Sequence, residues 1–509
     1  MKRPSRDFVR EYLRARVTTL LYCSARRRRR PNRQGYGFAL VAMLLPMAIA
    51  PAFGAVTISS AAASNMSCSG GVCTPTAANA VLNVSDLTSM LASGNVTVNT
   101  GTGSLRSQVE DILVTASFNW ASANALTLDA YRSVTVSAPV AVNGSAPVSL
   151  VTNDGGSGGY LSFISGGSLS FLGTANGVSI DGAAYTLENS VATLASAVTA
   201  NPAGNYALAN SYDAKNDGTY SNSPIAVEFS GNFEGFGNTI SDLSLKGTGN
   251  MNDYVGLFAE LALNNQHAGS IENVALQNVK VSGEVFTAGG LVGLNTGTVS
   301  GSFVSGSVSS KSGYGMGLLA GENFGTITRS GAIGNILGGM GGLTAGNDGV
   351  ISQSYADCTV STDGGGSTDI GGLAGDNEGA ISESYAFGKV SSSGAADIGG
   401  LVGENLEEGT IAQAYSITAV KSEYKDKGGL IGVDYSPPGS NTSTYWDTST
   451  SKIKGRSKGA GNVKNDPGIT GLTTAQLTSG LPSGFDPTIW AESPSINSGY
   501  PYLIANPPQ

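Results

Sequence analysis

The sequence IGGLAGDNEGAISESYAFGKV, residues 370–390, decides the fold because the chain repeats it. The pattern recurs in four other full copies and in one shortened copy, each containing an equivalent leucine. These leucines are Leu291, Leu319, Leu343, Leu373, Leu401 and Leu430. A divergent copy contains Leu257, and successive leucines from there are 34, 28, 24, 30, 28 and 29 residues apart. Repeats of this period predict a solenoid rather than one closed core.

Each copy predicts two or three short strands joined by tight corners. In the copy around Leu373, a short apolar run is followed by the turn signal Asp376–Gly379, in which we interpret Asn377 as a residue that tolerates left-handed backbone. An extended run then leads to Tyr385, and a Ser- and Gly-rich turn follows Val390. No helical period of 3.6 residues runs through the region, so the corners separate strands.

A single repeat is too small to fold alone. It buries three or four aliphatic side chains, each stabilising the fold by about 1.5–3 kcal/mol. Ordering the backbone costs about 1–2 kcal/mol for every residue. Stacking of repeats must therefore supply the remaining free energy, which favours a β-helix over independent modules.

The consensus GGLxGxNxGxIxxSYAxGxV resembles the GLUG motif. That motif is found in large bacterial surface proteins similar to filamentous haemagglutinin and in some immunoglobulin-A-cleaving peptidases. The resemblance covers Val255–Val433. Segments 80–98, 119–130 and 232–240 also resemble haemagglutinin-like exoproteins. The resemblance implies a right-handed parallel β-helix and adhesin-type surface biology. The expected partners are a host or neighbouring-cell glycan or protein and an outer-membrane secretion transporter.

Composition and charge agree with an exported solenoid. The chain has 72 glycines in 509 residues without a collagen period, and only 13% of its residues are charged. Residues 1–35 hold twelve basic and two acidic residues, a net charge of +10. The rest holds 16 of the 28 basic and 35 of the 37 acidic residues, a net charge of −19. A net negative charge of this size over the rest of the chain disfavours binding to nucleic acid.

The chain divides into five predicted parts. A basic segment and the apolar run 38–50 predict an export signal over residues 1–55, and no second apolar run is long enough to span a membrane. We expect haemagglutinin-like β-solenoid coils over 56–180, a junction over 181–250, the β-helix repeats over 251–435 and a C-terminal capping region over 436–509. The localisation expected is secreted or cell-surface, associated with the outer membrane.

Some elements outside the repeats are also predicted. Alternating runs between Val81 and Leu172 predict strands, and Val191–Ala200 predicts a short helix that ends before a proline. Thr473–Leu477 predicts one helical turn beginning at a capping residue. We expect two clusters of buried side chains, one in the junction and one closing the C-terminal end of the stack: Phe233, Phe236, Ile240 and Leu243, and Trp490, Tyr500, Tyr502 and Leu503.

The cysteines allow two interpretations. Cys68 and Cys73 follow the export signal, and export favours a disulfide that closes a small hairpin. Two free thiols are the alternative, whereas a metal site would need more ligands than a chain with one histidine offers. Cys358 takes the place of Gly388 in its repeat, and we expect a buried free thiol there.

The sequence offers little for catalysis. The single histidine, His267, lies in a predicted exposed loop, and the sequence contains neither HExxH nor a GxSxG nucleophile elbow with a plausible base. Carboxylate-based glycoside hydrolysis and calcium-dependent lyase chemistry remain open. The candidate acids are Asp376, Glu378, Glu383, Glu404, Glu407 and Glu408. Most fall at predicted turns and differ between repeats, so we interpret them as solvated turn residues.

The function expected from these observations is a non-enzymatic, adhesin-like β-helix protein with no catalytic, cofactor or metal-binding residue. It would present a repetitive surface for cell or matrix attachment. The alternative is a polysaccharide-active β-helix enzyme, either a lyase or a glycoside hydrolase. The nonapeptide spacing of calcium-binding β-rolls is missing, and no calcium site is predicted.

Overall fold

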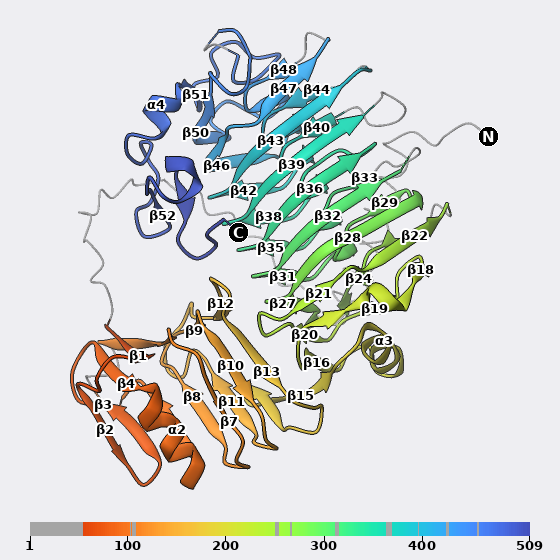
Figure 1. Ribbon diagram of the computed structural model, residues 1–509. Helices are drawn as coiled ribbons and strands as arrows, with labels where there is room; N and C mark the ends of the chain where they lie inside the picture. Colours follow the sequence, from red (N-terminus) through yellow and green to blue (C-terminus); the bar gives the residue numbers. More distant parts are fainter. Residues whose placement is uncertain are drawn as a thin grey trace, which may run out of the picture.

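The computed structural model describes residues 54–101, 103, 108–249, 254–264, 267–310, 315–362, 369–394, 397–423, 427–455 and 458–508. Figure 1 shows two stacks of β-coils set at an angle to one another, the first from the N-terminal third of the chain. Together they form a β-solenoid of about 14 turns. The predicted fold class, a parallel β-helix with a short helical junction, is confirmed. The predicted export signal lies outside the described residues except for Gly54 and Ala55, which begin the first strand.

The first stack has three faces of mostly parallel strands around one apolar core. The first face has the strand order β4-β1-β6-β9-β12, with β1 Gly54–Ser59, β4 Ala80–Asn83, β6 Val109–Val114, β9 Val134–Val136 and β12 Leu161–Phe163. The second face contains β2 Met66–Ser69, β3 Val72–Pro75, β5 Val96–Asn99, β8 Leu126–Asp129, β11 Val148–Val151 and β14 Val178–Ile180. The third face contains β7 Phe118–Trp120, β10 Pro139–Val142 and β13 Ser168–Phe171.

The N-terminal end of this stack carries a helix that the sequence analysis missed. Where only strands were predicted, α2 runs from Val84 to Ser93, and the Asn83 side chain caps it by accepting a hydrogen bond of 2.8 Å from the Ser85 amide. Leu87 and Leu91 are fully buried on its inner side. An open stack would expose apolar core here, and this helix covers part of it.

The junction joins the stacks through continuous backbone pairing. β14 turns into β15, Ala183–Glu188, and β15 pairs in parallel with β16, Asn205–Leu208. Between them lies α3, Val191–Ala200, with the bounds predicted from the sequence. The short elements that follow are β17 Tyr212–Asp213, the 3-10 helix η2 Ala214–Asp217 and β18 Thr219–Ser221. Of the four predicted core residues here, Phe236 packs in the first core and the others in the second.

The second stack also has three main faces. The first contains β16 and then β20 Asn232–Glu234, β27 Ser270–Glu272, β31 Thr298–Ser300, β35 Thr326–Thr328, β38 Val350–Ser352, β42 Ala380–Ser382 and β46 Thr410–Ser416. The second contains β21 Thr239–Ser241, β22 Ser244–Thr248, β28 Ala275–Glu284, β32 Phe303–Ser309, β36 Gly331–Leu337, β39 Tyr355–Thr362, β43 Tyr385–Ser392 and β47 Ala419–Ser422. The third contains β19 Ile225–Phe229, β24 Phe258–Leu261, β30 Val292–Asn295, β34 Ala320–Asn323, β37 Thr344–Asn347, β41 Ala374–Asn377, β45 Val402–Asn405 and β49 Ile431–Asp434.

Short strands complete the coils. Two parallel sets lie beside the third face: β23 Tyr254–Val255, β29 Thr287–Ala288 and β33 Gly315–Met316, and β40 Asp369–Gly371, β44 Asp397–Gly399 and β48 Lys427–Gly428. An antiparallel hairpin projects from one coil, with β25 Leu263–Asn264 and β26 His267–Ala268. The last coil contains β50 Asn441–Asp447 and β51 Ile469–Leu472.

The repeated leucines form the spine of the second core. All six, from Leu291 to Leu430, have no exposed side-chain surface. Their backbones also pair between coils: the Leu373 amide donates to the Leu401 carbonyl at 2.8 Å, and the Leu401 amide donates to the Leu430 carbonyl at the same distance. Each coil therefore contributes both apolar surface and backbone hydrogen bonds to the next.

The repeated asparagines are not turn residues, which corrects the interpretation made from the sequence. Asn295, Asn323, Asn347, Asn377 and Asn405 each end a strand of the third face and are fully buried. Each amide donates to the side-chain oxygen of the next rung at 2.6–3.2 Å, and Asp434 ends the series. An amide both donates and accepts, so identical asparagines can form a continuous ladder.

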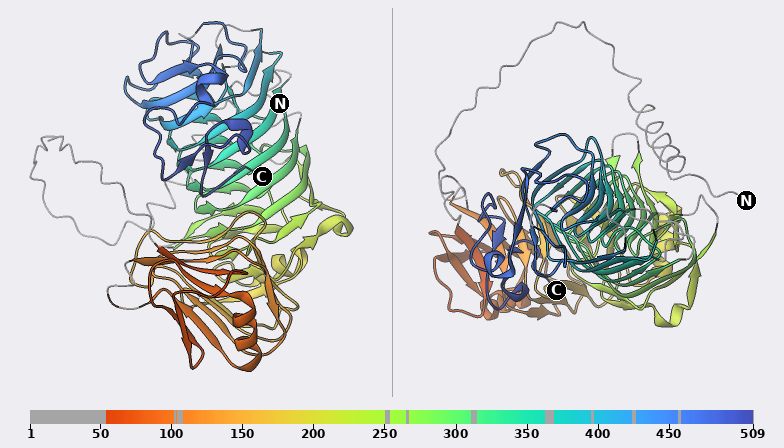
Figure 2. Two further views of the ribbon diagram at one scale, coloured as in Figure 1. Left: turned by 60° about the vertical axis from the view of Figure 1, so that its left-hand side comes forward. Right: turned by 90° about the horizontal axis from the view of Figure 1, so that it is seen from above.

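A second ladder occupies the flank of the stack. Tyr355, Tyr385 and Tyr415 stack with ring centroids 5.1–5.2 Å apart and are fully buried although they face away from the main core. The C-terminal segment, residues 473–508, covers them. It contains α4 Thr474–Leu477, β52 Trp490–Ala491, the 3-10 helix η3 Asn497–Gly499 and β53 Tyr502–Leu503. Figures 1 and 2 show this segment in dark blue along the side of the stack.

The C-terminal aromatic residues therefore cover a flank and not the end of the stack, where the sequence analysis placed them. Trp490, Tyr500 and Leu503 pack on the tyrosine ladder. Near the chain end, Asn506 Nδ2 donates to the carbonyls of Ser330 and Gln353 at 3.0 and 3.1 Å. The end of the core is filled by other residues, Trp446, Ile453, Ala460 and Ile469.

Candidate functional site

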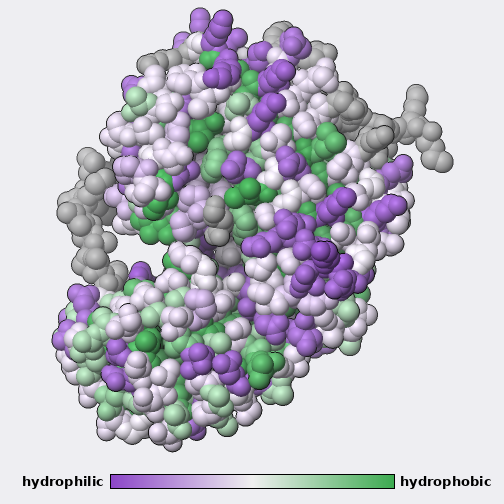
Figure 3. Space-filling model, in the orientation of Figure 1, coloured by the Kyte–Doolittle hydropathy of each residue, from purple (hydrophilic) through white to green (hydrophobic). Residues whose placement is uncertain are grey.

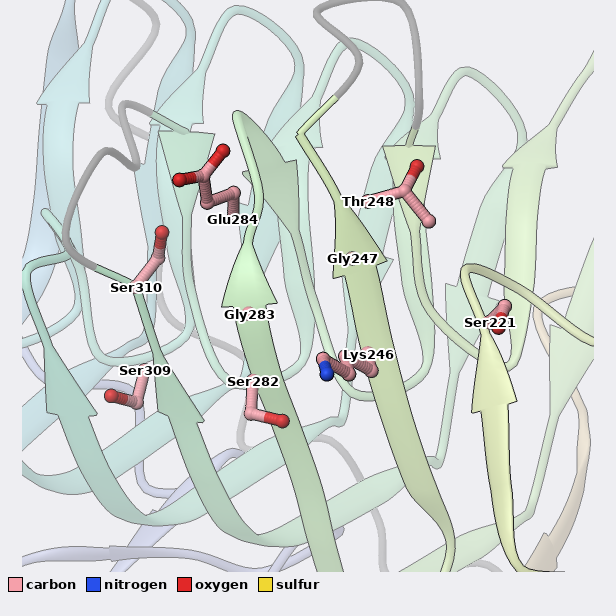
Figure 4. A pocket seen from close by; sticks show the side chains of 9 residues that line it. All are labelled: Ser221, Lys246, Gly247, Thr248, Ser282, Gly283, Glu284, Ser309 and Ser310. Atoms are coloured by element: carbon pink, nitrogen blue, oxygen red, sulfur yellow. The ribbon is translucent and has the colours of Figure 1, made fainter.

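One candidate binding site is a groove across four neighbouring strands of the second stack. Figure 4 shows the side chains of β18, β22, β28 and β32 that border it. It has a volume of about 660 Å³ and lies on the second face of the stack. The lining residues are Ser221, Lys246, Gly247, Thr248, Ser282, Gly283, Glu284, Ser309 and Ser310. Figure 3 shows hydrophilic side chains gathered over this part of the surface.

Two glycines in register form the floor of the groove. Gly247 of β22 pairs with Gly283 of β28. A Cβ on Gly247 would lie 2.1 Å from a methyl carbon of Val285, and one on Gly283 would lie 2.6 Å from the Gly247 carbonyl oxygen. Gly283 also has a φ of +93°, in the left-handed region that favours glycine. The groove is thus a consequence of close strand packing.

The chemistry of the groove suits polar binding. Hydroxyl groups from five residues border it, together with one cation, Lys246, and one anion, Glu284. Thr248 is held by Asn222, whose Oδ1 accepts from the Thr248 amide at 3.1 Å. Glycoside hydrolysis by the two-carboxylate route needs a pair of acids, and this lining supplies one. The arrangement can therefore bind a polar chain without that chemistry.

The candidate acids named from the sequence do not share one environment. Glu407 and Glu408 are exposed at a corner, as expected for solvated turn residues, and Glu378 and Glu383 are half-buried. Asp376 and Glu404 differ, because they lie in register on the adjacent strands β41 and β45. Asp376 is only 5% exposed, so the interpretation of this residue as a solvated turn acid is wrong.

The structure brings Glu404 together with two aspartates that the sequence analysis did not single out. Carboxylate oxygens of Asp369, Asp397 and Glu404 lie within 4.8 Å of one another. Hard cations such as Ca²⁺ prefer oxygen ligands of this kind. The available sequence signal was the repeated Asp-Ile-Gly-Gly at 369–372 and 397–400, which places two aspartates in register on β40 and β44.

A second cavity, of about 340 Å³, lies at the junction of the two stacks. Glu234 of β20 and Glu272 of β27 line it in register, and Asp181 and Tyr185 line it from the β14–β15 turn and β15. Burial, and then the charge of Glu272, raise the pKa of Glu234 well above its usual range. Burial also raises the pKa of Glu272 and of Tyr185.

One cation of the second stack, Arg329, contacts Tyr160 in the lining of this cavity. The Arg329 guanidinium lies 3.9 Å from the centre of the Tyr160 ring and donates a hydrogen bond to Ser300 Oγ at 2.8 Å. Burial lowers the pKa of Arg329, and the negative charge of Glu272 opposes that effect. Sequence reasoning missed this cavity because its residues come from segments up to 120 positions apart that share no motif.

The cysteines are in two chemical states. Cys68 and Cys73 form a disulfide across the antiparallel β2–β3 hairpin. Cys358 is a buried free thiol in register with Gly388. The backbone of His267 pairs with that of Asn264 in the β25–β26 hairpin.

Comparisons with known proteins give no family. No protein-family model matches the chain, and no curated protein is significantly similar to it in sequence. Among the described residues, no helix has both the length and the apolar character needed to cross a membrane.

Proposed function

We propose that the chain is an exported, non-enzymatic, adhesin-like β-helix protein that presents a repetitive surface for attachment to cells or matrix. The observation that carries this proposal is the polar groove bordered by Lys246 and Glu284, because its lining offers many hydroxyl groups and a single acid. Hydroxyl groups and one charge of each sign suit hydrogen bonding to a glycan or an extended peptide. The resemblance to GLUG-containing surface proteins supports the same function.

The stack contributes rigidity to this function. Each rung is fixed to its neighbours by backbone pairing, by a buried leucine and by the asparagine ladder. A ligand that lies across several rungs therefore meets groups whose spacing is set by the β-sheet, about 4.8 Å from strand to strand. Such pre-organisation lowers the entropy cost of binding. The proposed location is the outer-membrane surface or the medium, reached through a secretion transporter.

Binding to glycan arrays and to whole cells tests the proposal. Ser282→Trp would fill the groove, and Lys246→Ala with Glu284→Ala would remove both charges. We expect each variant to lose at least tenfold in affinity. The matched control is Lys389→Ala, which removes an exposed lysine from β43 on the same face. Unchanged binding by both groove variants would contradict attachment through this groove.

The second candidate function is calcium-dependent action on a polysaccharide. The observation in its favour is the carboxylate cluster of Asp369, Asp397 and Glu404. Release of reducing or unsaturated ends from a panel of polysaccharides, with and without Ca²⁺, tests it. An active protein should lose this release when Asp397→Asn is introduced, whereas Glu408→Gln, at an exposed corner, should keep it.

A further inference from the structure

Several hydrogen bonds join the two stacks beside the junction cavity. The Leu169 amide of β13 donates to the Phe236 carbonyl at 2.9 Å, and the Phe171 amide donates to the Ala209 carbonyl at 2.7 Å. Asn273 Nδ2 donates to the Leu161 carbonyl at 3.2 Å. These hydrogen bonds, the pairing of β14, β15 and β16, and the packing of Phe236 in the first core together form the junction around the cavity that Glu234 and Glu272 line.

β20 separates the two sides of this junction. Phe233 points into the core of the second stack, whereas its neighbour Glu234 points toward the first. Glu272 follows Glu234 in register on the next strand, so the two carboxyl groups share one face. Side chains in register on adjacent parallel strands start about 4.8 Å apart. Two carboxylates so close in a buried site cannot both be ionised without strong repulsion.

The groups facing the pair do not neutralise it. Asp181 adds a third carboxylate from the first stack, and Tyr160 and Tyr185 add phenols. Arg329 is the cation among the described residues that acts on Glu272. Glu234 accepts hydrogen bonds from neutral donors: the Phe236 amide and Asn273 Nδ2 donate to its two oxygens at 2.8 and 3.1 Å. The described lining of the cavity thus holds three carboxyl groups, and the guanidinium of Arg329 acts on one of them, Glu272.

We propose that a proton shared by Glu234 and Glu272 locks the two stacks together, so that the junction is closed in acid and loosens as the pH rises. While one carboxyl group is neutral, the pair can lie buried against the first stack. Loss of the proton leaves two adjacent buried charges, and separation of the stacks then hydrates them. The angle between the stacks would become pH-dependent while each stack stays folded.

The direction of the pH dependence follows from the difference in proton binding between the closed and the open junction. The folded chain holds the proton more tightly than the opened chain, in which water hydrates the carboxylates. The stability of the junction is therefore fully present below the ordinary pKa of a glutamic acid and is lost as the pH rises through the raised pKa of the pair. With one proton released on opening, the opening equilibrium changes by up to about tenfold per pH unit.

Hydrogen–deuterium exchange of the full chain at a series of pH values tests the proposal, with each peptide corrected by its exchange in the unfolded chain. Peptides over β15 and β16 report on the junction, and peptides over β36 and β39 report on the second stack. We expect protection of the junction peptides to fall by up to about tenfold per pH unit, with the second-stack peptides unaffected. Equal pH dependence in both sets would overturn the proposal.

Two variants separate a proton lock from general instability. Glu234→Gln keeps the shape but cannot ionise, and its amide can accept from only one of the two donors, Phe236 and Asn273. Protection of its junction should therefore be independent of pH. Glu272→Gln should also flatten the profile, which keeps the test decisive if one of the two fails to fold. Glu408→Gln, an exposed carboxylate, should keep the wild-type profile. A junction that keeps its pH dependence in a folded Glu234→Gln protein, or that responds to Ca²⁺ instead of pH, contradicts the proposal.

Discussion

Asn347 Nδ2 donates a hydrogen bond of 2.7 Å to Oδ1 of Asn377 one rung away, and both side chains are fully buried. Asn377 in turn donates to Asn405 at 2.8 Å. A buried amide without partners would cost free energy, but here each amide is satisfied by an identical neighbour. The ladder therefore stabilises the stack only when its rungs are in register.

Replacing Asn377 by leucine should destabilise the second stack by about 1–3 kcal/mol. Leucine has the branched shape of asparagine and is larger, and the change leaves the Asn347 amide without its side-chain acceptor and the Asn405 oxygen without its side-chain donor. Urea-induced unfolding followed by circular dichroism measures the effect. Glu408→Leu at an exposed corner is the control and should stay within about 0.5 kcal/mol of wild type. Equal midpoints for the two variants would show that the ladder contributes nothing.

The spacing of the leucines was sufficient to predict a stack, because each repeat had to bury its apolar side chains against the next. The asparagines were misinterpreted because Asn before Gly is also a common turn signal. The corners instead place other residues at positive φ, among them Arg329, Gln353, Glu383 and Gln413. Long polar side chains give no sequence signal for left-handed backbone, so these corners could not be predicted.

Contacts between distant segments could not be predicted from the sequence. The tyrosine of each Ser-Tyr-Ala motif pointed to a strand, but nothing in the repeat showed that Tyr385 would face outward and be covered by the segment that includes Trp490. The junction cavity arises in the same way, because Glu234 and Asp181 come together only when two separate stacks pack. Such sites depend on tertiary packing and have no local pattern.

Leu373→Ala should reduce the stability of the second stack by about 2–5 kcal/mol, because the leucine is fully buried and its removal leaves a cavity. Thermal unfolding and limited proteolysis measure this loss. Leu337 offers a matched control because 55% of its surface is exposed in β36, and Leu337→Ala should have little effect. Similar melting temperatures for both variants would argue against an inward-facing leucine spine.

Trp490→Ala should release the C-terminal segment from the tyrosine ladder. The indole packs against the rings of Tyr385 and Tyr415 at 5.9 and 5.8 Å, and truncation of a buried tryptophan costs about 3–5 kcal/mol. We expect faster proteolysis within 473–508 and binding of a hydrophobic dye to the exposed ladder. Ile504→Ala, at a residue that is 45% exposed, is the control. A protease-resistant C-terminal segment in the tryptophan variant would show that its docking does not depend on the ladder.

Cys358 should resist alkylation while the stack is folded. Burial raises the pKa of its thiol, so the thiol stays protonated at neutral pH, and the thiolate is the form that reacts. Its sulfur lies 3.6 Å from the carbonyl oxygens of Ala332 and Gly342, inside the second core. Iodoacetamide labelling at pH 8, measured by mass spectrometry on the peptide that contains Cys358, should be slow in buffer and fast in denaturant. Leu373→Ala should accelerate labelling in buffer because it raises the unfolded population, whereas Leu337→Ala should not. Rapid labelling of the native wild-type chain would mean that the core around Cys358 opens far more often than its packing implies.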